Sequence, residues 1–215
     1  MIIRKSEIAI IGIIVLSFVI GICFYPQMPE KMAFHWNVKG EVDGYMSKFW
    51  VLFLMPFVLV GLALFFFVIP KIDPLKKNIE GFRKYYDGFI ILFFVFLFSI
   101  NLQVILWNLG VEISPNVMLP IGIGILFFYL GILGEHSKRN WSIGIRTAWT
   151  LSSEKVWDKT NKVGGKLLKI AGVITFAGVF FQRYMLFFII IPVAAAAIYA
   201  IIYSYVEYQK ETDKC

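Results

Sequence analysis

Few residues of this chain could carry chemistry, and most of them are scattered. The clearest grouping surrounds His35, which is preceded by Glu30 and followed by Glu41 and Asp43. An imidazole beside carboxylates is a ligand type for a divalent cation, but this spacing matches no ligand motif. The second histidine, His136, lies in a different part of the chain. We therefore expect no metal site.

Enzymatic chemistry is not indicated by the apolar segments. They contain no pair of acids and no H-E-x-x-H, G-x-S-x-G or phosphate-binding motif. One apolar segment carries three polar residues, Ser99, Asn101 and Gln103, of which the first and third share a helix face. Hydrogen bonds between helices are the expected role of such residues, and a transport pathway is the alternative. We predict a protein that is not an enzyme and that uses no cofactor.

The elements that position these residues are expected to be membrane helices. Apolar residues make up 59% of the 215 positions, which is more apolar surface than one soluble core of this size could bury. The formal charge of +7 comes from basic residues beside the apolar segments, where membrane lipids are the expected partners rather than nucleic acid. Six membrane-spanning segments are predicted, at residues 8–24, 49–69, 88–107, 117–133, 166–181 and 184–206.

The distribution of positive charge predicts how the chain crosses the membrane. Sixteen Lys and Arg residues fall in the two termini and in segments 70–87 and 134–166, against four in the alternate segments. Positively charged loops stay in the cytoplasm, so both termini are predicted to lie inside. The predicted fold is an all-α integral protein of the cell membrane with six spans, a structured outer loop at 25–48 and an inner loop at 134–165. Two domains are expected, residues 1–110 and 111–215.

Both loops carry local signals of structure. In the outer loop, two prolines favour an extended start, and Lys39-Gly40 and Asp43-Gly44 are typical of turns. In the inner loop, Thr150 or Ser152 is expected to cap a short helix that lies along the cytoplasmic membrane interface. Gly164-Gly165 is then expected to turn this helix into the fifth span.

The residues of the two loops also resemble a known family. The outer loop resembles the domain of unknown function that begins SdpI-type membrane proteins, through Tyr25-Pro26-Gln27-Met28-Pro29, His35-Trp36-Asn37, Gly40-Glu41, Asp43-Gly44 and Ser47-Lys48. The inner loop is similar to the second signature of the SdpI immunity-protein family, through Asn140, Ile143-Gly144-Ile145-Arg146-Thr147, Trp149-Thr150, Ser153, Val156-Trp157, Thr160 and Gly164. The sequence departs from the family at Ala148, where Pro is frequent, and at Asn161, where His is common.

This resemblance covers nearly the whole chain and implies a function. It implies a membrane protein that protects its cell against a secreted peptide toxin acting on the membrane. It also implies a signalling role, in which the protein holds a small cytoplasmic DNA-binding autorepressor at the membrane without binding nucleic acid itself. A small transporter or exporter, or a ligand-sensing membrane receptor, is the alternative function.

Two sets of loop residues are the candidate sites. The outer set would face the toxin and consists of His35, Trp36, Asn37, Gly40, Asp43 and Gly44. The alternative for this set is structural, with the glycines needed for positive φ and the tryptophan as an interface anchor. The inner set would dock an acidic partner or a lipid phosphate and consists of Asn140, Gly144, Arg146, Thr147, Trp149 and Trp157. The alternative for the inner set is a solvated basic loop that lies on lipid head groups.

Overall fold

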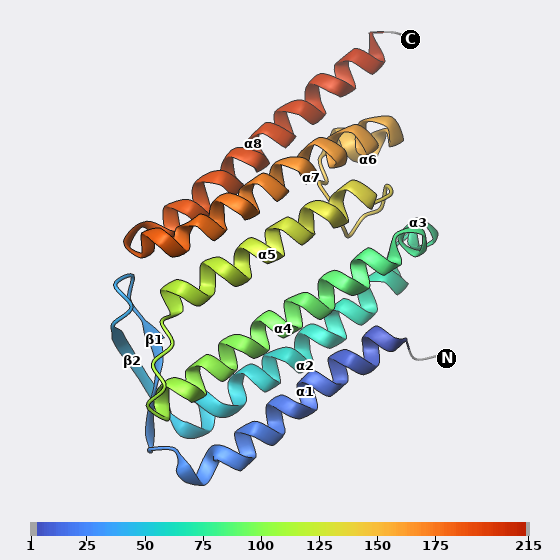
Figure 1. The fold of residues 1–215 in the computed structure, drawn as a ribbon. Coiled ribbons are helices and arrows are strands. Elements are labelled where there is room, and N and C mark those ends of the chain that lie inside the picture. Colours follow the sequence, from blue (N-terminus) through green and yellow to red (C-terminus); the bar gives the residue numbers. More distant parts are fainter. Residues whose placement is uncertain (1–3, 214–215) are drawn as a thin grey trace. The chain divides into compact units, whose positions relative to one another are not determined.

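The structure, a computed structural model, describes residues 4–213 and consists mainly of long helices (Figure 1). The long helices are α1 (Lys5–Phe24), α2 (Lys48–Ile72), α4 (Arg83–Asn108), α5 (Pro115–His136), α7 (Glu154–Ala177) and α8 (Met185–Thr212). The short ones are α3 (Lys76–Gly81) and α6 (Ala148–Ser152), with the 3-10 turns η1 (Tyr25–Gln27) and η2 (Gly178–Tyr184). Each of the six predicted spans overlaps one long helix.

Five helical segments of the described chain are long and apolar enough to cross a membrane. Four of them correspond to α1 with η1, α2, α4 and α5. The fifth, Glu154–Thr212, contains both α7 and α8, which are joined by η2. The fold is therefore that of a helical membrane protein, whereas the count of six crossings and their direction remain predictions.

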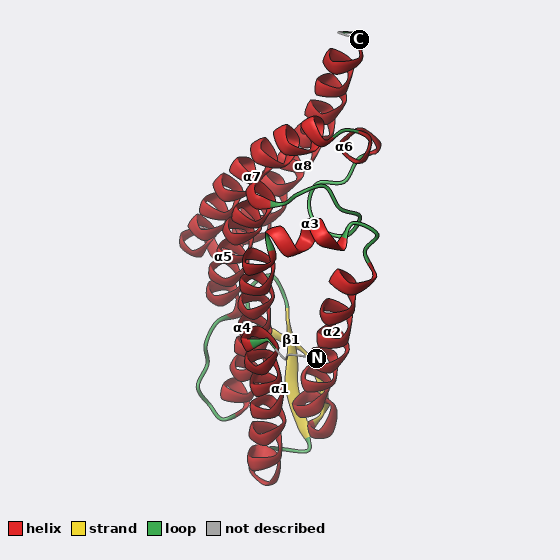
Figure 2. Cartoon of the chain, turned by 90° about the vertical axis from the view of Figure 1, so that its right-hand side faces the viewer, coloured by secondary structure: helices red, strands yellow, loops and turns green. Residues whose placement is uncertain are grey.

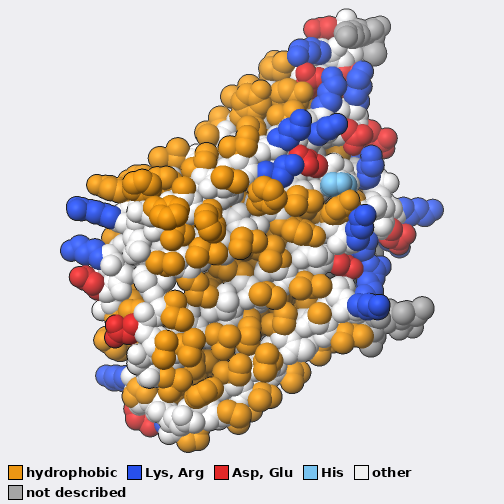
Figure 3. Space-filling view, viewed as in Figure 1, with side chains coloured by type: hydrophobic (Ala, Val, Ile, Leu, Met, Phe, Trp, Pro, Cys, Tyr) orange, Lys and Arg blue, Asp and Glu red, His pale blue; other side chains and the backbone are white. Residues whose placement is uncertain are grey.

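Packing contacts divide the chain into two compact units. Unit 1 contains the residues up to Phe67 together with Ile90–Leu119, and unit 2 contains Val68–Phe89 together with the residues from Pro120 onward. Each unit takes segments from both predicted domains, and the division at residue 110 remains a prediction. In unit 2, hydrophobic side chains cover the helix flanks, while Lys and Arg gather near α3, α6 and the end of α8 (Figure 3).

An apolar cluster fills the core of unit 1. Met28 and Met32 pack with Val51 and Leu52 of α2 and with Ile105 of α4, and all five are buried. A buried hydrogen bond joins two helices of the same unit, in which Asn101 Nδ2 of α4 donates to Ser17 Oγ of α1 at 3.0 Å. This is the kind of interhelical bond that the sequence predicts for a polar residue in an apolar segment.

The segment between α1 and α2 folds into a β-hairpin, which the all-α prediction did not include. Strand β1 (Lys31–Trp36) pairs antiparallel with β2 (Val42–Ser47) in the only sheet that residues 4–213 form (Figure 2). The expected turn at Gly40 is confirmed, since this residue has a φ of +81°. The expected turn at Asp43-Gly44 is wrong, because both residues lie within β2. Gly44 pairs with His35 where the register is irregular, and a glycine at such a place often marks a bulge instead of a turn.

Two pairs of glycines bring α5 and α7 together in unit 2. A Cβ at Gly124 would lie 2.8 Å from the carbonyl oxygen of Gly172, and a Cβ at Gly131 would collide with that of Gly165. Only hydrogen fits at such contacts, so the two backbones touch directly. Both helices repeat their glycine after seven residues, which is close to two turns. The pairs therefore lie along one continuous line of contact between antiparallel helices.

The expected turn at Gly164-Gly165 is wrong. Helix α7 runs without interruption from Glu154 to Ala177, so the predicted interfacial helix and the start of the fifth span form one element. Gly165 packs against α5, and a Cβ at Gly164 would collide with the side chain of Ile145. Both glycines therefore serve close packing inside the helix.

The helix caps also differ from the expectation. Ser153 caps α7 by accepting a hydrogen bond from Val156 N at 3.3 Å. Thr147 caps α6, and its Oγ1 accepts from Thr150 N at 3.1 Å. The predicted caps, Thr150 and Ser152, lie inside α6 instead. Several hydroxyl residues adjoin each other here, so the sequence alone does not select which of them caps a helix.

Candidate functional site

One side chain, Asn37, builds the turn of the hairpin. Its Oδ1 accepts hydrogen bonds from the backbone N–H groups of Lys39 and Glu41 at 2.8 and 3.1 Å. Its Nδ2 donates to Glu41 Oε2 at 2.9 Å. Gly40 supplies the positive φ and donates its N–H to Asn37 O at 2.9 Å. The predicted residues Asn37 and Gly40 thus give the exposed turn a fixed shape.

Two further asparagines fasten the hairpin to the helices of unit 1. Asn108, the last residue of α4, accepts from Ala33 N at 2.8 Å and donates to Ala33 O at 2.9 Å, much as a neighbouring strand would. Asn116 of α5 donates its Nδ2 to Val38 O at 3.0 Å. Because both ends of the hairpin are held, its exposed side chains need little further ordering to bind a partner.

His35, Asp43 and Gly44 meet on one exposed face of the hairpin. The Nδ1 atom of His35 and the Oδ1 atom of Asp43 are 2.5 Å apart, and both side chains are largely exposed. A Cβ at Gly44 would lie 2.8 Å from His35 Cβ, so only glycine fits opposite the histidine. The φ of Gly44 is not positive, which corrects the structural alternative considered for this residue.

The other acids near His35 have partners elsewhere. Glu41 bonds to Asn37, and Glu30 pairs with Lys48 at 2.8 Å. Within residues 4–213, no three His, Cys, Asp or Glu side chains form a group that could hold a metal ion. The chemistry of this face is therefore that of a single imidazole and carboxylate pair.

Trp36 is the last residue of β1, and the polar atom of its side chain is buried. Its ring lies edge-on against Trp107 of α4, with centroids 5.3 Å apart. The Nε1 donor of Trp36 is buried and has no hydrogen-bond partner in the described part of the chain. An unmet buried donor costs about 1–3 kcal/mol, and this atom is enclosed by the protein, so a ligand does not reach it unless the side chains around it move.

An apolar groove of about 190 Å³ opens beside the hairpin in unit 1. Phe34 and Met46 line it from the strands, Trp50 and Met55 from α2, and Asn101 from α4. Aromatic and methionine side chains adapt to apolar ligands of varied shape. We call this groove, together with the six predicted residues of the outer loop, the hairpin surface.

The loop between α5 and α7 (residues 137–153, which include α6) is held by two buried acceptors. Asn140 is fully buried, and its Oδ1 accepts from the N–H groups of Ser142 and Ile143 at 2.8 and 2.6 Å. Asp73, which follows α2, accepts from Trp141 N at 3.0 Å and from Ser142 Oγ at 2.5 Å. The predicted residue Asn140 therefore shapes the loop from within.

Gly144, Trp157 and Asn161 fix the next part of this loop. Gly144 has a φ of +117°, and a Cβ there would lie 2.8 Å from Asn161 Oδ1 and 2.9 Å from Trp157 Cζ2. Asn161 Oδ1 accepts from Ile145 N at 2.7 Å. Trp157 is fully buried and donates its Nε1 proton to Ser137 O at 3.1 Å. The contacts of Gly144 and Trp157 are thus structural, although both are candidate docking residues.

The remaining predicted residues of the loop lie nearer its surface. Thr147 Oγ1 donates to Ser204 Oγ of α8 at 3.0 Å, and Trp149 packs against Tyr205 with ring centroids 5.2 Å apart. Arg146 is exposed and donates one Nη1 proton to Trp141 O at 2.6 Å. No carboxylate pairs with Arg146 among the residues that the structure describes.

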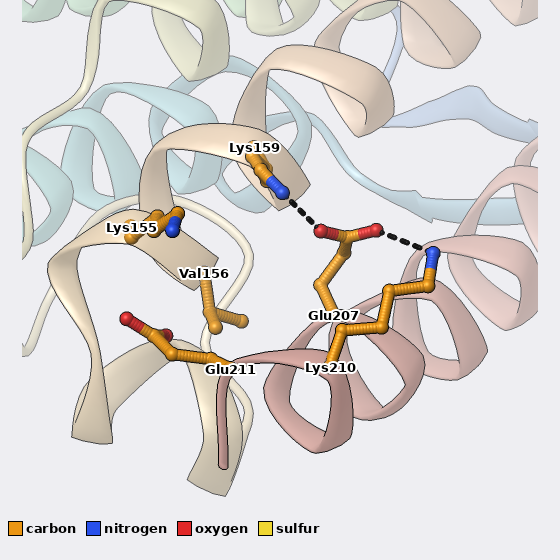
Figure 4. A pocket seen from close by; sticks show the side chains of 6 residues that line it. All are labelled: Lys155, Val156, Lys159, Glu207, Lys210 and Glu211. Carbon is orange, nitrogen blue, oxygen red and sulfur yellow. Dashed lines mark hydrogen bonds and ion pairs between the residues drawn. The ribbon is translucent and has the colours of Figure 1, made fainter. Parts of the chain in front are cut away.

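A small polar pocket of about 160 Å³ joins the start of α7 to the end of α8 (Figure 4). Glu207 is 6% exposed, and its carboxylate pairs with Lys159 on one side and with Lys210 Nζ at 3.0 Å on the other. Glu211, which also lines the pocket, accepts a hydrogen bond from Ser153 Oγ to its Oε2 atom at 2.6 Å. Two of the lysines that line the pocket thus share one carboxylate, and the ion pair between Lys159 and Glu207 links α7 to α8.

The three polar residues of the third predicted span all have protein partners. Ser99 Oγ donates to Phe96 O of its own helix at 2.7 Å. Gln103 Nε2 donates to Ile113 O at 2.9 Å, and Asn101 bonds to Ser17 as described above. These contacts are structural and do not point into a shared polar channel.

Four residues that organise these surfaces were not among the predicted sites, namely Asp73, Asn108, Asn161 and Glu207. The sequence offers a weak signal for two of them. Asp73 precedes Pro74, a dipeptide typical of a turn, and Asn108 follows the predicted span 88–107, two residues before Gly110. Asn161 and Glu207 lie in polar helical segments, where nothing distinguishes them from solvated residues.

Two family models match the chain. Residues 12–60 match the domain of unknown function DUF1648, and residues 137–204 match the SdpI/YfhL protein family. The immunity protein SdpI of Bacillus subtilis (strain 168) is 29% identical over 208 residues, which are 96% of this chain and 97% of that protein. Residues 137–204 thus form a region of the SdpI/YfhL family, and nearly the whole chain is similar to an immunity protein of that type. No solved structure matches it.

Both sets of candidate loop residues lie inside the matched regions. The DUF1648 match includes the hairpin, and the SdpI/YfhL match includes the α5–α7 loop, α7 and most of α8. Together with its five apolar helical segments, this similarity identifies a multi-pass protein of the cell membrane.

Proposed function

We propose that this protein is a membrane immunity protein that protects its cell against a secreted, membrane-active peptide toxin. The proposal rests on its similarity to an immunity protein over nearly the whole length of both chains. The protein acts by binding and not by catalysis. The sequence is in keeping with this, since its apolar segments carry none of the catalytic motifs sought.

The toxin contacts the hairpin surface. The predicted outer loop at 25–48 carries three Lys, fewer than either of the two loop segments predicted to be cytoplasmic, and the positive-inside rule therefore supports an extracellular hairpin. Its turn is held by Asn37, and its apolar groove would take a hydrophobic side chain. These are the contacts that a short amphipathic peptide needs.

A signalling role is a second candidate function, favoured by the order of the α5–α7 loop. Asn140 and Asp73 hold this loop in one shape, and Arg146 is exposed on it. A cytoplasmic repressor could dock on such a surface. Transport is less favoured, because Ser99, Asn101 and Gln103 are all bonded within the protein.

The test is to express this chain in toxin-sensitive bacteria, add an SDP-type peptide and follow membrane potential with a dye. The wild-type protein should preserve the potential, and Trp36→Ala should abolish this protection at equal abundance in the membrane. Trp141→Ala, which removes an exposed tryptophan from the α5–α7 loop, is the matched control and should protect normally. Collapse of the potential despite full insertion of the wild-type chain would contradict the immunity function.

A further inference from the structure

A second apolar groove, of about 250 Å³, lies in unit 2 against α7 and α8. Leu168 of α7 forms one wall. Val193, Ala197 and Ala200 of α8 form the other, where the small alanine side chains leave the space open. Arg146 also lines the groove, as part of the loop segment that closes one end.

The two ends of this groove differ in chemistry. The hydrogen bond from Thr147 to Ser204 fixes the loop beside the polar end of α8, so the neighbouring Arg146 stands at that end. Val193 lies seven residues before Ala200, further from the charged end of α8, and the two positions are about 10 Å apart at 1.5 Å per residue. The groove therefore runs from a cationic end into an apolar one.

The charge at this end is not neutralised within the protein. In the nearby pocket of Figure 4, Glu207 already pairs with Lys159 and Lys210. Arg146 instead donates one proton to the carbonyl of Trp141 and has no carboxylate partner among the described residues. Its remaining N–H groups form a planar fork that suits the two oxygens of a phosphate.

We propose that this groove binds one acyl chain of an anionic phospholipid, whose phosphate is held by Arg146. The flank of α8 around the groove exposes large apolar side chains, including Ile190, Ile198 and Ile202, so the groove opens toward the hydrocarbon of the bilayer. A helix of a second copy is about 10–12 Å wide and does not fit a space of this size, whereas an acyl chain does. The bound lipid fixes the depth of the α5–α7 loop at the level of the phosphates.

The experiment uses the purified full chain in nanodiscs that contain phosphatidylglycerol with a photoreactive diazirine in its acyl chain. After illumination, mass spectrometry of the peptides locates the adducts. We expect them to concentrate on the peptides that contain Leu168 and Ala197. Unlabelled phosphatidylglycerol should compete for this labelling, and unlabelled phosphatidylcholine should compete much less. Equal competition by the two lipids would overturn the role given to the phosphate.

Three variants test the two ends of the groove separately. Arg146→Gln removes the cation and should lower adduct yield in the groove about tenfold, the effect expected for charge-assisted hydrogen bonds. Ala197→Phe places a large side chain in the groove from an exposed position on α8 and should also lower the adduct yield. Lys162→Gln removes an exposed charge from α7 outside the groove and should leave the yield unchanged.

Two outcomes would refute the proposal outright. One is an even spread of adducts over all lipid-exposed helices, and the other is a normal yield in both Arg146→Gln and Ala197→Phe. Elution volume and helical circular dichroism show whether each variant is folded. If Arg146→Gln does not fold, Arg146→Lys takes its place, because it keeps the charge, loses the fork and should give an intermediate yield. Cross-links between two copies through α8 would assign the groove to an oligomer interface instead.

Discussion

Asp73 lies just beyond α2, yet its carboxylate holds a loop 68 positions further along the chain. One oxygen accepts from Leu75 N at 2.7 Å, and the other accepts from Trp141 N and Ser142 Oγ. The side chain is 3% exposed, so water does not replace these bonds when the carboxylate is removed. Donors left unmet in such a place cost more free energy than the bonds themselves contribute.

We therefore expect Asp73→Ala to lower the free energy of unfolding by about 1–3 kcal/mol and to loosen the α5–α7 loop. Limited trypsin digestion in detergent should cut this loop faster than in the wild type. The control is Asp158→Ala, which breaks a largely exposed ion pair with Lys138 at 3.7 Å and should change stability by about 0–1 kcal/mol. Equal trypsin resistance of the wild type and Asp73→Ala would show that the loop is ordered by other contacts.

Gly144 illustrates a second effect at the same scale, the combination of backbone strain with crowding. Gly110 has a similar positive φ of +89° but open space around its Cβ position, whereas a Cβ at Gly144 would press on Asn161 and Trp157. Gly110→Ala should cost about 1–2 kcal/mol from the backbone alone. Gly144→Ala should cost clearly more, because one of the two side chains must move. Thermal unfolding of both variants measures the difference, and equal losses would show that Trp157 moves aside freely.

At the scale of elements, α5 and α7 depend on backbone contact. Their glycine pairs bring carbonyl oxygens within van der Waals distance of the opposite helix, and Lys169 of α7 pairs with Glu135 of α5 at 2.8 Å beside them. In lipid, hydrophobic burial adds little to the association of helices, so packing of this kind carries more of the stability. The α5–α7 loop connects these two helices, so the position of its two ends depends on how the helices pack.

Gly131→Leu should therefore separate α5 from α7, because its side chain would occupy the position of the Gly165 carbonyl. We expect early thermal unfolding in detergent and reduced abundance in the membrane. Gly61→Leu in α2 is the matched control, since nothing lies within 4 Å of its Cβ position, and it should behave like the wild type. Comparable abundance and melting of the two variants would rule out tight packing at Gly131.

How far the sequence predicts these elements depends on the range of the contacts involved. The apolar segments, with their length and flanking charge, predicted every long helix, since a bilayer leaves few other folds. The hairpin was missed because its strands are short and mixed in polarity, so pairing depends on Asn108 at the far end of α4. Gly164-Gly165 was taken for a turn because a glycine pair breaks a helix locally and its packing partner on α5 is invisible in sequence.

For the candidate sites, too, local contacts could be predicted from the sequence and long-range contacts could not. The turn at Gly40 was predicted from local turn chemistry and is confirmed, whereas the part that Asn37 plays in this turn was not predicted. Asp73 and Asn161 act on residues far away or on another element, which no local pattern encodes. Sequence alone also could not show that Arg146 is exposed while Trp157, another residue of the inner candidate set, is fully buried.

At the scale of the whole molecule, the proposed functions require the hairpin and the α5–α7 loop to face opposite sides of the membrane. The toxin arrives from outside, and a repressor would bind from the cytoplasm. The charge bias predicts this arrangement, with sixteen basic residues on one side and four on the other. Hydrophobic matching does not decide it, because each long helix could cross in either direction.

Cysteine labelling of intact cells measures this orientation directly. In a background of Cys23→Ser and Cys215→Ser, a cysteine placed by Lys39→Cys in the hairpin turn should react with a membrane-impermeant maleimide. A cysteine placed by Lys162→Cys on the exposed face of α7 should react only after the membrane is opened. The reverse pattern would place Arg146 outside and the hairpin in the cytoplasm, where a secreted toxin does not reach it. Labelling of both in intact cells would mean an even number of crossings between them, so at least one of the three long helices that separate them, α2, α4 and α5, would not span the bilayer.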